Sequence, residues 1–249
     1  MHPIRSTIIV LSISASVLLI TLICLLIPKN DNYSRLQSNT IEKLENLHTK
    51  LKIKYGTFQE ELVEQTMAVD YITENRKVLE LGGNIGRNSL VIASILKDST
   101  NLVVLESDDG IAKQLEENRN LNNLSFHIEP SALSIRKLIQ KGWDTIPSET
   151  LQDGYKWVQT ISLENLRNKY NVLYDTLVID CEGAFYYILK DMPDILNNIT
   201  LIVMENDYRD MEHKIYVDSV LTQNNFQRVY VQKGGFEPCY EMFWEVWSK

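Results

Sequence analysis

Two short motifs place acidic side chains beside glycines, an arrangement suited to holding a small molecule. Residues 80–86 read Glu-Leu-Gly-Gly-Asn-Ile-Gly, and residues 180–184 read Asp-Cys-Glu-Gly-Ala. A glycine turn between a strand and a helix lets a ligand approach the backbone closely, and the first amides of the helix meet its negative groups. Carboxylates at the same place can hold a positive group or take a proton. The two motifs therefore predict a binding and catalytic site.

The first motif does not fit a dinucleotide. A dinucleotide-binding turn requires G-x-G-x-x-G. Counting from Gly82, the chain has Asn84 and Arg87 where the second and third glycines should stand. A cofactor without a pyrophosphate fits better, and S-adenosylmethionine is such a cofactor. Glu80 would hold its positive amino group directly or through water. The alternative is a purely structural glycine turn.

An acidic residue also ends the next apolar run. Glu106 follows residues 102–105, and a carboxylate at the end of a second strand can accept hydrogen bonds from both hydroxyls of a ribose. The alternative is a solvated loop acid beside Asp108 and Asp109. The predicted cofactor site comprises Glu80, Gly82, Gly83, Asn84, Gly86, Glu106 and Ser131.

The second motif supplies candidate general bases. Asp180 and Glu182 follow the apolar run 176–179, and open α/β sheets bind ligands outside the carboxyl ends of their strands. A sulfonium methyl group is already activated, so the protein mainly aligns the acceptor. A hydroxyl acceptor also benefits from a positioned base. We predict Asp180 as the first candidate and Glu182 as the second. Capping of the following helix is an alternative that is compatible with catalysis.

Three further residues are candidates for contact with the acceptor. Trp143 and Tyr155 lie in the stretch 141–155, where aromatic rings would stack on a sugar face; an ordinary surface insertion is the alternative. Glu205 ends the apolar run 201–204. The histidines have no metal-ligand spacing, and no Cys-x-x-Cys occurs. We therefore expect that no metal is required, although the paired carboxylates are able to hold Mg²⁺.

These residues need a scaffold that alternates strands and helices. The apolar pattern predicts strands at residues 78–81, 102–105, 124–128, 176–179, 201–204, 226–231 and 240–246. It predicts helices at residues 58–72, 88–96, 111–120, 163–169, 184–190 and 215–221. The stretch 135–159 is expected to form a helix followed by a loop. The series predicts an α/β fold with a doubly wound, mostly parallel seven-stranded sheet, Rossmann-like as in methyltransferases, and an antiparallel C-terminal hairpin.

At these residues the chain resembles the FkbM-type methyltransferases. Their glycine turn is similar to D-x-G-A-N-x-G, which residues 80–86 match with Glu80 for the aspartate and Gly83 for the alanine. Their second strand ends in an acidic residue, as at Glu106. Their fifth strand ends in a glutamate, as at Glu205.

Two later segments extend the resemblance, which covers residues 78–206. Residues 160–166 resemble T-L-D-x-L, and residues 178–185 resemble K-I-D-x-E-G-A-E. Val178 replaces the lysine and Phe185 replaces the second glutamate, so a substrate contact at those positions is in doubt. The resemblance implies methyl transfer from S-adenosylmethionine to an oxygen, often on sugars or natural products.

The N-terminus predicts a single-pass membrane anchor. Residues 8–27 contain no charged side chain, and as a helix they would span roughly 30 Å, the thickness of a bilayer's hydrocarbon core. A cleaved signal peptide is the alternative, but its apolar core is shorter and precedes a small-residue cleavage site. We predict an anchor over residues 1–28, a linker and stalk over residues 29–54, and a methyltransferase domain over residues 55–249. The flanking charges lean only weakly towards a cytosolic domain.

The composition of the chain limits the classes of molecule that it is expected to bind. The net charge of -8 disfavours nonspecific binding to nucleic acid, because phosphates attract basic surfaces. We therefore expect a small-molecule or glycan acceptor, a membrane contact through the N-terminal helix, and no nucleic acid. Two other functions remain open. One is a catalytically degenerate, membrane-tethered binding module of the same fold, and the other is a nicotinamide-dependent reductase, which the missing glycines disfavour.

Overall fold

The computed structural model describes residues 31–249, and the chain divides into two compact units, residues 1–42 and 43–249. Helix α2 (Asp31–Lys50) begins in the first unit and ends in the second. It replaces the linker expected at its start, because no glycine or proline interrupts it. The predicted membrane span, residues 8–27, lies outside the described residues. Within the described range, no helix is long and apolar enough to cross a membrane.

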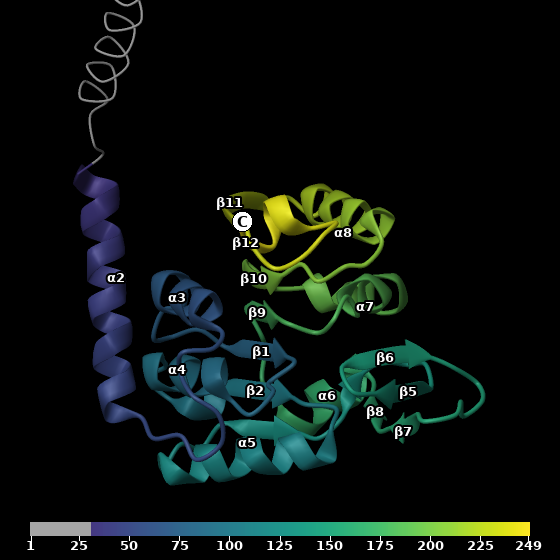
Figure 1. The fold of residues 1–249 in the computed structure, drawn as a ribbon. Helices are drawn as coiled ribbons and strands as arrows, with labels where there is room; N and C mark the ends of the chain where they lie inside the picture. Colours follow the sequence, from purple (N-terminus) through teal and green to yellow (C-terminus); the bar gives the residue numbers. More distant parts are fainter. Residues whose placement is uncertain (1–30) are drawn as a thin grey trace, which may run out of the picture. The chain divides into compact units, whose positions relative to one another are not determined.

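The second unit is built on a seven-stranded sheet (Figure 1) with the strand order β11-β12-β10-β9-β1-β2-β3. Its strands are β1 (Val78–Leu81), β2 (Leu102–Leu105), β3 (His127–Glu129), β9 (Thr176–Ile179), β10 (Leu201–Glu205), β11 (Gln227–Gln232) and β12 (Trp244–Ser248). Neighbours from β3 to β10 are parallel, whereas β12 is antiparallel to both β10 and β11. The predicted α/β fold with a mostly parallel sheet is confirmed, and the last strand lies between β10 and β11.

Helices cover both faces of the sheet. One apolar core contains α6 (Leu163–Tyr170), α7 (Phe185–Asp191) and α8 (Met211–Gln223). The other contains α3 (Leu62–Tyr71), α4 (Arg87–Ile95), α5 (Asp109–Leu121) and Leu44 near the end of α2. Successive side chains of a strand point to opposite faces, so Leu177 and Ile179 of β9 join the first core and Val178 joins the second. Short 3-10 helices span Ser99–Asn101, Pro193–Leu196 and Tyr240–Met242.

The register of the sheet brings the predicted site residues to one edge. Leu81, the last residue of β1, pairs with Leu105 of β2 and with Ile179 of β9. The register continues into β10. Gly82, Glu106 and Asp180 directly follow β1, β2 and β9, and Glu205 is the last residue of β10. All four residues therefore lie at the same edge of the sheet.

The stretch 135–159 departs from the predicted helix and loop. It forms a three-stranded antiparallel sheet of β5 (Leu138–Lys141), β6 (Asp144–Pro147) and β7 (Lys156–Val158), in the order β6-β5-β7. Two short strands, β4 (Ala132–Leu133) and β8 (Thr160–Ile161), pair in parallel. The helix prediction was wrong because these short strands are held by pairing with one another, and such pairing leaves no repeating pattern within a single segment. Figure 1 shows this part beyond the carboxyl ends of β1 and β2.

Candidate active site

A cavity of about 310 Å³ opens at the carboxyl ends of β1, β2, β9 and β10. That size is within the range of small-molecule sites. Of the residues predicted from sequence, the cavity is lined by Gly82, Asn84, Glu106, Ser131, Trp143, Asp180, Glu182 and Glu205. The small sheet also contributes Leu138, Gln140 and Thr145 to the lining.

The glycines of the first motif serve close packing. Gly82 has a φ of 89°, and a Cβ there would lie 1.6 Å from the carbonyl oxygen of Asp180. Gly82 therefore lets the loops after β1 and β9 approach each other at the cavity. Gly83 and Gly86 do not line the cavity. A Cβ at Gly83 or Gly86 would overlap the side chains of Val104 or Leu115, so these two glycines let the turn pack against β2 and α5.

Glu106 joins two loops at the cavity wall. The backbone N–H of Asn84 donates to its Oε2 at 2.9 Å, and the N–H of Asp108 donates to its Oε1 at 2.8 Å. The side chain is only 6% exposed, and burial raises the pKa of Glu106. Each carboxylate oxygen keeps a further lone pair. Glu106 is therefore able to accept two more hydrogen bonds from a ligand.

Glu80 lies beneath the cavity rather than in its wall. It is 2% exposed, and its Oε2 has no hydrogen-bond partner within the described part of the chain. It lines a second cavity of about 10 Å³, which Asp180 and Glu205 also line; that volume is near the minimum for one water. Burial raises the pKa of Glu80 to about 8. A contact between Glu80 and a ligand therefore needs a bridging water.

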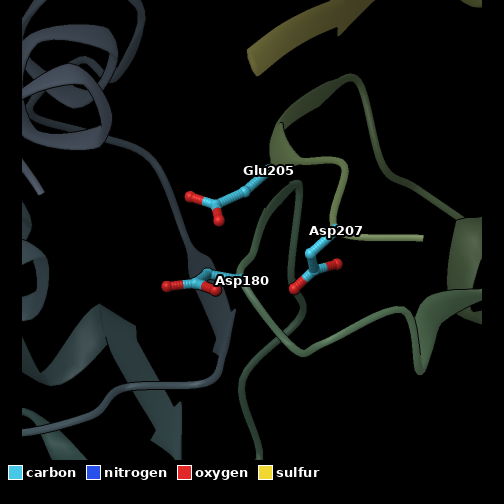
Figure 2. A group of neighbouring side chains, drawn as sticks. All are labelled: Asp180, Glu205 and Asp207. Atoms are coloured by element: carbon cyan, nitrogen blue, oxygen red, sulfur yellow. The ribbon is translucent and has the colours of Figure 1, made fainter. Parts of the chain in front are cut away.

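Asp180 belongs to a group of three carboxylates at the ends of β9 and β10. One carboxylate oxygen from each of Asp180, Glu205 and Asp207 lies within 4.8 Å of the other two, and Figure 2 shows the three side chains gathered between their loops. Burial, followed by the charge of Asp207, raises the pKa of Asp180 well above its ordinary value. Burial raises the pKa of Asp207 to about 7. Ionisation of all three carboxyl groups together is therefore unfavourable.

A tryptophan and another glutamate extend this group. The indole Nε1 of Trp244 donates to Glu205 Oε2 at 3.1 Å and to Glu64 Oε1 at 2.7 Å. Burial, and then the neighbouring Glu64, raise the pKa of Glu205 to about 11. Glu205 therefore holds a proton at neutral pH unless a positive charge enters the group.

Glu182 occupies a different position from Asp180. Its backbone is left-handed, with a φ of 51°, and its exposed side chain lines the cavity. Partial burial raises the pKa of Glu182, while Arg209 lowers it. The N-cap of α7 is Ala184, and no side chain makes a capping hydrogen bond there. Capping of α7 therefore does not explain either acidic residue of the second motif.

The two aromatic candidates separate in the structure. Trp143 lines the cavity and is 57% exposed. Tyr155 does not line it, and its hydroxyl instead donates to Asp144 Oδ2 at 2.7 Å. Ser131 reaches the cavity while its hydroxyl donates to Glu129 Oε1 at 3.0 Å. Only Trp143 is therefore placed to offer a ring face to an acceptor.

Three acidic residues near the cavity escaped sequence reasoning. Asp207 lies two residues beyond Glu205, so the rule that placed Asp180 at a strand end would also have found it. Glu61 and Glu64 precede β1, and no local pattern marks them. Asn84 Nδ2 donates a hydrogen bond to Glu61 Oε1 at 3.1 Å, and Arg87 forms an ion pair with the same oxygen at 2.7 Å.

The charges around the cavity have one sign. Its lining includes the carboxyl groups of Glu61, Glu106, Asp180, Glu182 and Glu205. Among the described residues that line it, there is no lysine, arginine or histidine. Such a cavity favours a ligand that carries positive charge.

No protein-family model matches the chain, and no curated protein matches it. Solved structures do. The ribosomal protein L11 methylase from Lactobacillus delbrueckii subsp. bulgaricus superposes with a TM-score of 0.50 and 13% identity, over 79% of this chain and 81% of that one. The chain has the fold of that methylase.

Two weaker similarities add nothing to that assignment of the fold. The O-methyltransferase from Bacillus cereus, in complex with SAH, has a TM-score of 0.47 and 13% identity over 90% of this chain and 93% of that one. An rRNA methylase from Streptococcus thermophilus has a TM-score of 0.47 and 10% identity over 75% of this chain and 94% of that one.

Proposed function

We propose that this chain is an S-adenosylmethionine-dependent methyltransferase that methylates an oxygen of a sugar, a glycan or another small hydroxyl compound. The observation that carries the proposal is a carboxylate-lined cavity at the strand ends of a methylase fold. The sulfonium and ammonium groups of the cofactor are both positive, and the lining complements them. The resemblance of residues 78–206 to the FkbM-type methyltransferases supports the same activity.

The residues present fit the cofactor. Glu106 has lone pairs available for the two ribose hydroxyls, and its two backbone hydrogen bonds hold it in place. The Oε2 of Glu80 has no hydrogen-bond partner in the described part of the chain and lies beside a cavity for one water, which suits a water-mediated contact with the ammonium group. When bound, S-adenosylmethionine supplies a methyl group that is already activated as a sulfonium.

The chain's own side chains align the acceptor and take its proton. Glu182 is exposed to the cavity, so its carboxylate is placed to accept the proton of a hydroxyl. Asp180, the first candidate from sequence, is less suited, because it is buried beside Asp207, and both effects raise its pKa well above its ordinary value. Trp143 offers a ring face on which a sugar would stack. We therefore place Glu182 ahead of Asp180 as the general base.

A neutral acceptor suits the cavity better than a phosphate polymer. The lining is acidic and the net charge of the chain is -8. Phosphate contacts come mainly from lysine and arginine, and the cavity lining offers neither among the described residues. We therefore propose a sugar or other hydroxyl compound rather than RNA, although one neighbour of similar fold is an rRNA methylase.

The cofactor proposal predicts a calorimetric result. Full-length protein in detergent is expected to bind S-adenosylmethionine and not NADH. The Glu106→Ala variant is expected to bind S-adenosylmethionine more weakly by roughly 1–3 kcal/mol, the range for a lost hydrogen bond to a charged group. Isothermal titration of both proteins with both ligands measures this.

The matched control is Glu129→Gln. Glu129 is 5% exposed at the end of a strand, against 6% for Glu106, and it does not line the cavity. Glutamine keeps an oxygen that accepts the hydroxyl of Ser131, so this variant should leave the affinity nearly unchanged. Equal affinity of wild type and a folded Glu106→Ala variant would remove Glu106 from the ribose role. Binding of NADH alone would favour the reductase.

We also propose that the chain is anchored in a membrane by residues 8–27. The full-length chain is expected to stay in the membrane pellet after washing with alkaline carbonate, because an uncharged helix of this length matches the bilayer core. A chain starting at Asn39 should appear in the supernatant. Release of the full-length chain, or a mature N-terminus beyond Pro28, would contradict the anchor. Immunoblotting and N-terminal sequencing of the pellet distinguish these outcomes.

A further inference from the structure

The group formed by Asp180, Glu205 and Asp207 has the dimensions of a cation site. One oxygen from each residue lies within 4.8 Å of the other two. Two oxygen ligands of one ion lie at most about 5 Å apart around Ca²⁺ and at most about 4.2 Å apart around Mg²⁺, so the smaller ion needs a side-chain shift of a few tenths of an ångström. The three side chains, shown in Figure 2, come from the ends of the neighbouring strands β9 and β10. The same three oxygens can therefore contact a single ion without a change of fold.

Asp207 provides a second and independent indication. It is 5% exposed, and its Oδ1 accepts the N–H of Gly183 at 2.7 Å. Its Oδ2 has no hydrogen-bond partner among residues 31–249. A buried carboxylate oxygen without a partner is costly unless a ligand completes it. Asp207, which carries this oxygen, is one of the three residues whose carboxylate oxygens lie within 4.8 Å of one another.

Among residues 31–249, no positively charged side chain is among the groups that act most strongly on these three carboxylates. Glu64, 7% exposed, lies beside Glu205 and also has a partnerless oxygen in the described structure. The charged neighbours that act on Asp180 are Glu61, Glu64, Glu182 and Asp207, all of them carboxylates. A bound cation would neutralise the negative charge of these ionised carboxylates.

We propose that Asp180, Glu205 and Asp207 bind one divalent cation of the hard class, Mg²⁺, Mn²⁺ or Ca²⁺. Carboxylate oxygens are the ligands that these ions prefer. The proposal revises the expectation that no metal is required. It also differs from the pair suggested by sequence, since Glu182 lies outside the group and Asp207 replaces it.

The role of the ion rests on the proposed function, whereas its binding does not. An ion at this place would lie in the wall of the cavity, where Asp180 and Glu205 are exposed to an acceptor. A hydroxyl bound to a divalent cation has a lowered pKa. Glu182 would then take the proton, while Asp180 would serve as a ligand to the ion.

Electron paramagnetic resonance of Mn²⁺ tests the site without cofactor or acceptor. Full-length protein in detergent, stripped with EDTA, is titrated with Mn²⁺ alone. One ion per chain is expected to bind. Asp207→Asn and Glu205→Gln should each weaken it by at least about tenfold, because even residues behind the ligands change metal affinity by 10–100-fold. Asp153→Asn, which removes the same charge from an exposed turn, should leave it unchanged within about twofold.

A second measurement does not depend on replacing a ligand. Trp244 donates to Glu205 and Trp143 lines the same cavity, so Tb³⁺ bound at the site should luminesce when tryptophan is excited, and Trp244→Phe should lower that signal. Circular dichroism shows whether each variant is folded.

The proposal is overturned if Mn²⁺ does not bind, or if it binds equally to wild type, Asp207→Asn and Glu205→Gln. Sensitised Tb³⁺ emission that Trp244→Phe leaves unchanged would place the ion elsewhere and would also overturn the proposal. A titration of the EDTA-stripped protein with S-adenosylmethionine is kept separate. Failure of that titration with intact Mn²⁺ binding refutes the methyltransferase and leaves the cation site.

Discussion

Glu182→Gln is expected to lower turnover by roughly 100-fold, the scale for losing a general base, while the affinity for S-adenosylmethionine stays within a few-fold. Glutamine keeps the shape of the side chain but cannot accept a proton. Glu182 lines the cavity and is exposed to it; partial burial raises its pKa, while the positive charge of Arg209 opposes that rise. Single-turnover methyl transfer and calorimetric binding, measured on the same preparation, separate chemistry from affinity.

Asp180→Asn is the companion variant. If Asp180 is a ligand rather than the base, its loss of turnover should be partly restored by a large excess of Mn²⁺, whereas Glu182→Gln should not respond. If Asp180→Asn is inactive at every Mn²⁺ concentration and Glu182→Gln retains full turnover, Asp180 rather than Glu182 is the general base, as the sequence predicted. Full activity of both folded variants would mean that the acceptor is activated elsewhere.

Glu80→Gln is expected to stabilise the protein at pH 8 and to weaken the binding of S-adenosylmethionine. Burial raises the pKa of Glu80 from 4.5 to about 8. Between these values the folded protein holds a proton that the unfolded chain releases, so the free energy of unfolding falls as pH rises from 4.5 to 8. Each pH unit in that window costs up to about 1.4 kcal/mol.

Glutamine removes this loss because it does not ionise. At pH 8 we expect a gain of roughly 2–4 kcal/mol in the free energy of unfolding, which corresponds to a melting temperature higher by roughly 5–15 °C. Thermal unfolding between pH 5 and pH 8.5 measures the difference between wild type and variant. At pH 5 the two should converge, since Glu80 is then protonated in the folded state.

Glu129→Gln is the control for loss of a buried carboxylate. Glu129 is paired with Lys169 at 2.7 Å, so its replacement breaks a favourable contact and should not stabilise the protein. A Glu80→Gln variant that melts below wild type at pH 8 would show that the ionised carboxylate has a compensating partner. Unchanged affinity for S-adenosylmethionine in that variant would remove Glu80 from the cofactor site.

Local sequence was sufficient for the main sheet and its acidic ends. The predicted strands at residues 78–81, 102–105 and 176–179 coincide with β1, β2 and β9. A parallel strand buried on both faces is a continuous apolar run, and such runs are visible without knowledge of the fold. Glu106 and Asp180 directly follow their strands, so the general rule for ligand sites in open α/β sheets placed them at one edge.

The small sheet could not be predicted in this way. Its strands have three or four residues, and β6 and β7 are only partly buried. Their pairing depends on contacts between strands rather than on a repeating pattern within one segment. Trp143 and Tyr155 looked equivalent in sequence, but the hairpin turns one of them towards the cavity and ties the other to Asp144.

The tertiary structure alone decided which carboxylates meet. Trp244 contacts Glu64 across 180 positions of sequence because α3 packs against the sheet beside β10 and β12. Asp207 joins Asp180 because two parallel strands, separated by a crossover helix, end at the same level. The sequence alone determined that acidic residues would gather at one edge of a parallel sheet. Asp180 is grouped with Asp207 rather than with Glu182 because of the directions of their side chains. The backbone register places residues at an edge of the sheet, but only the packing of the loops sets these directions.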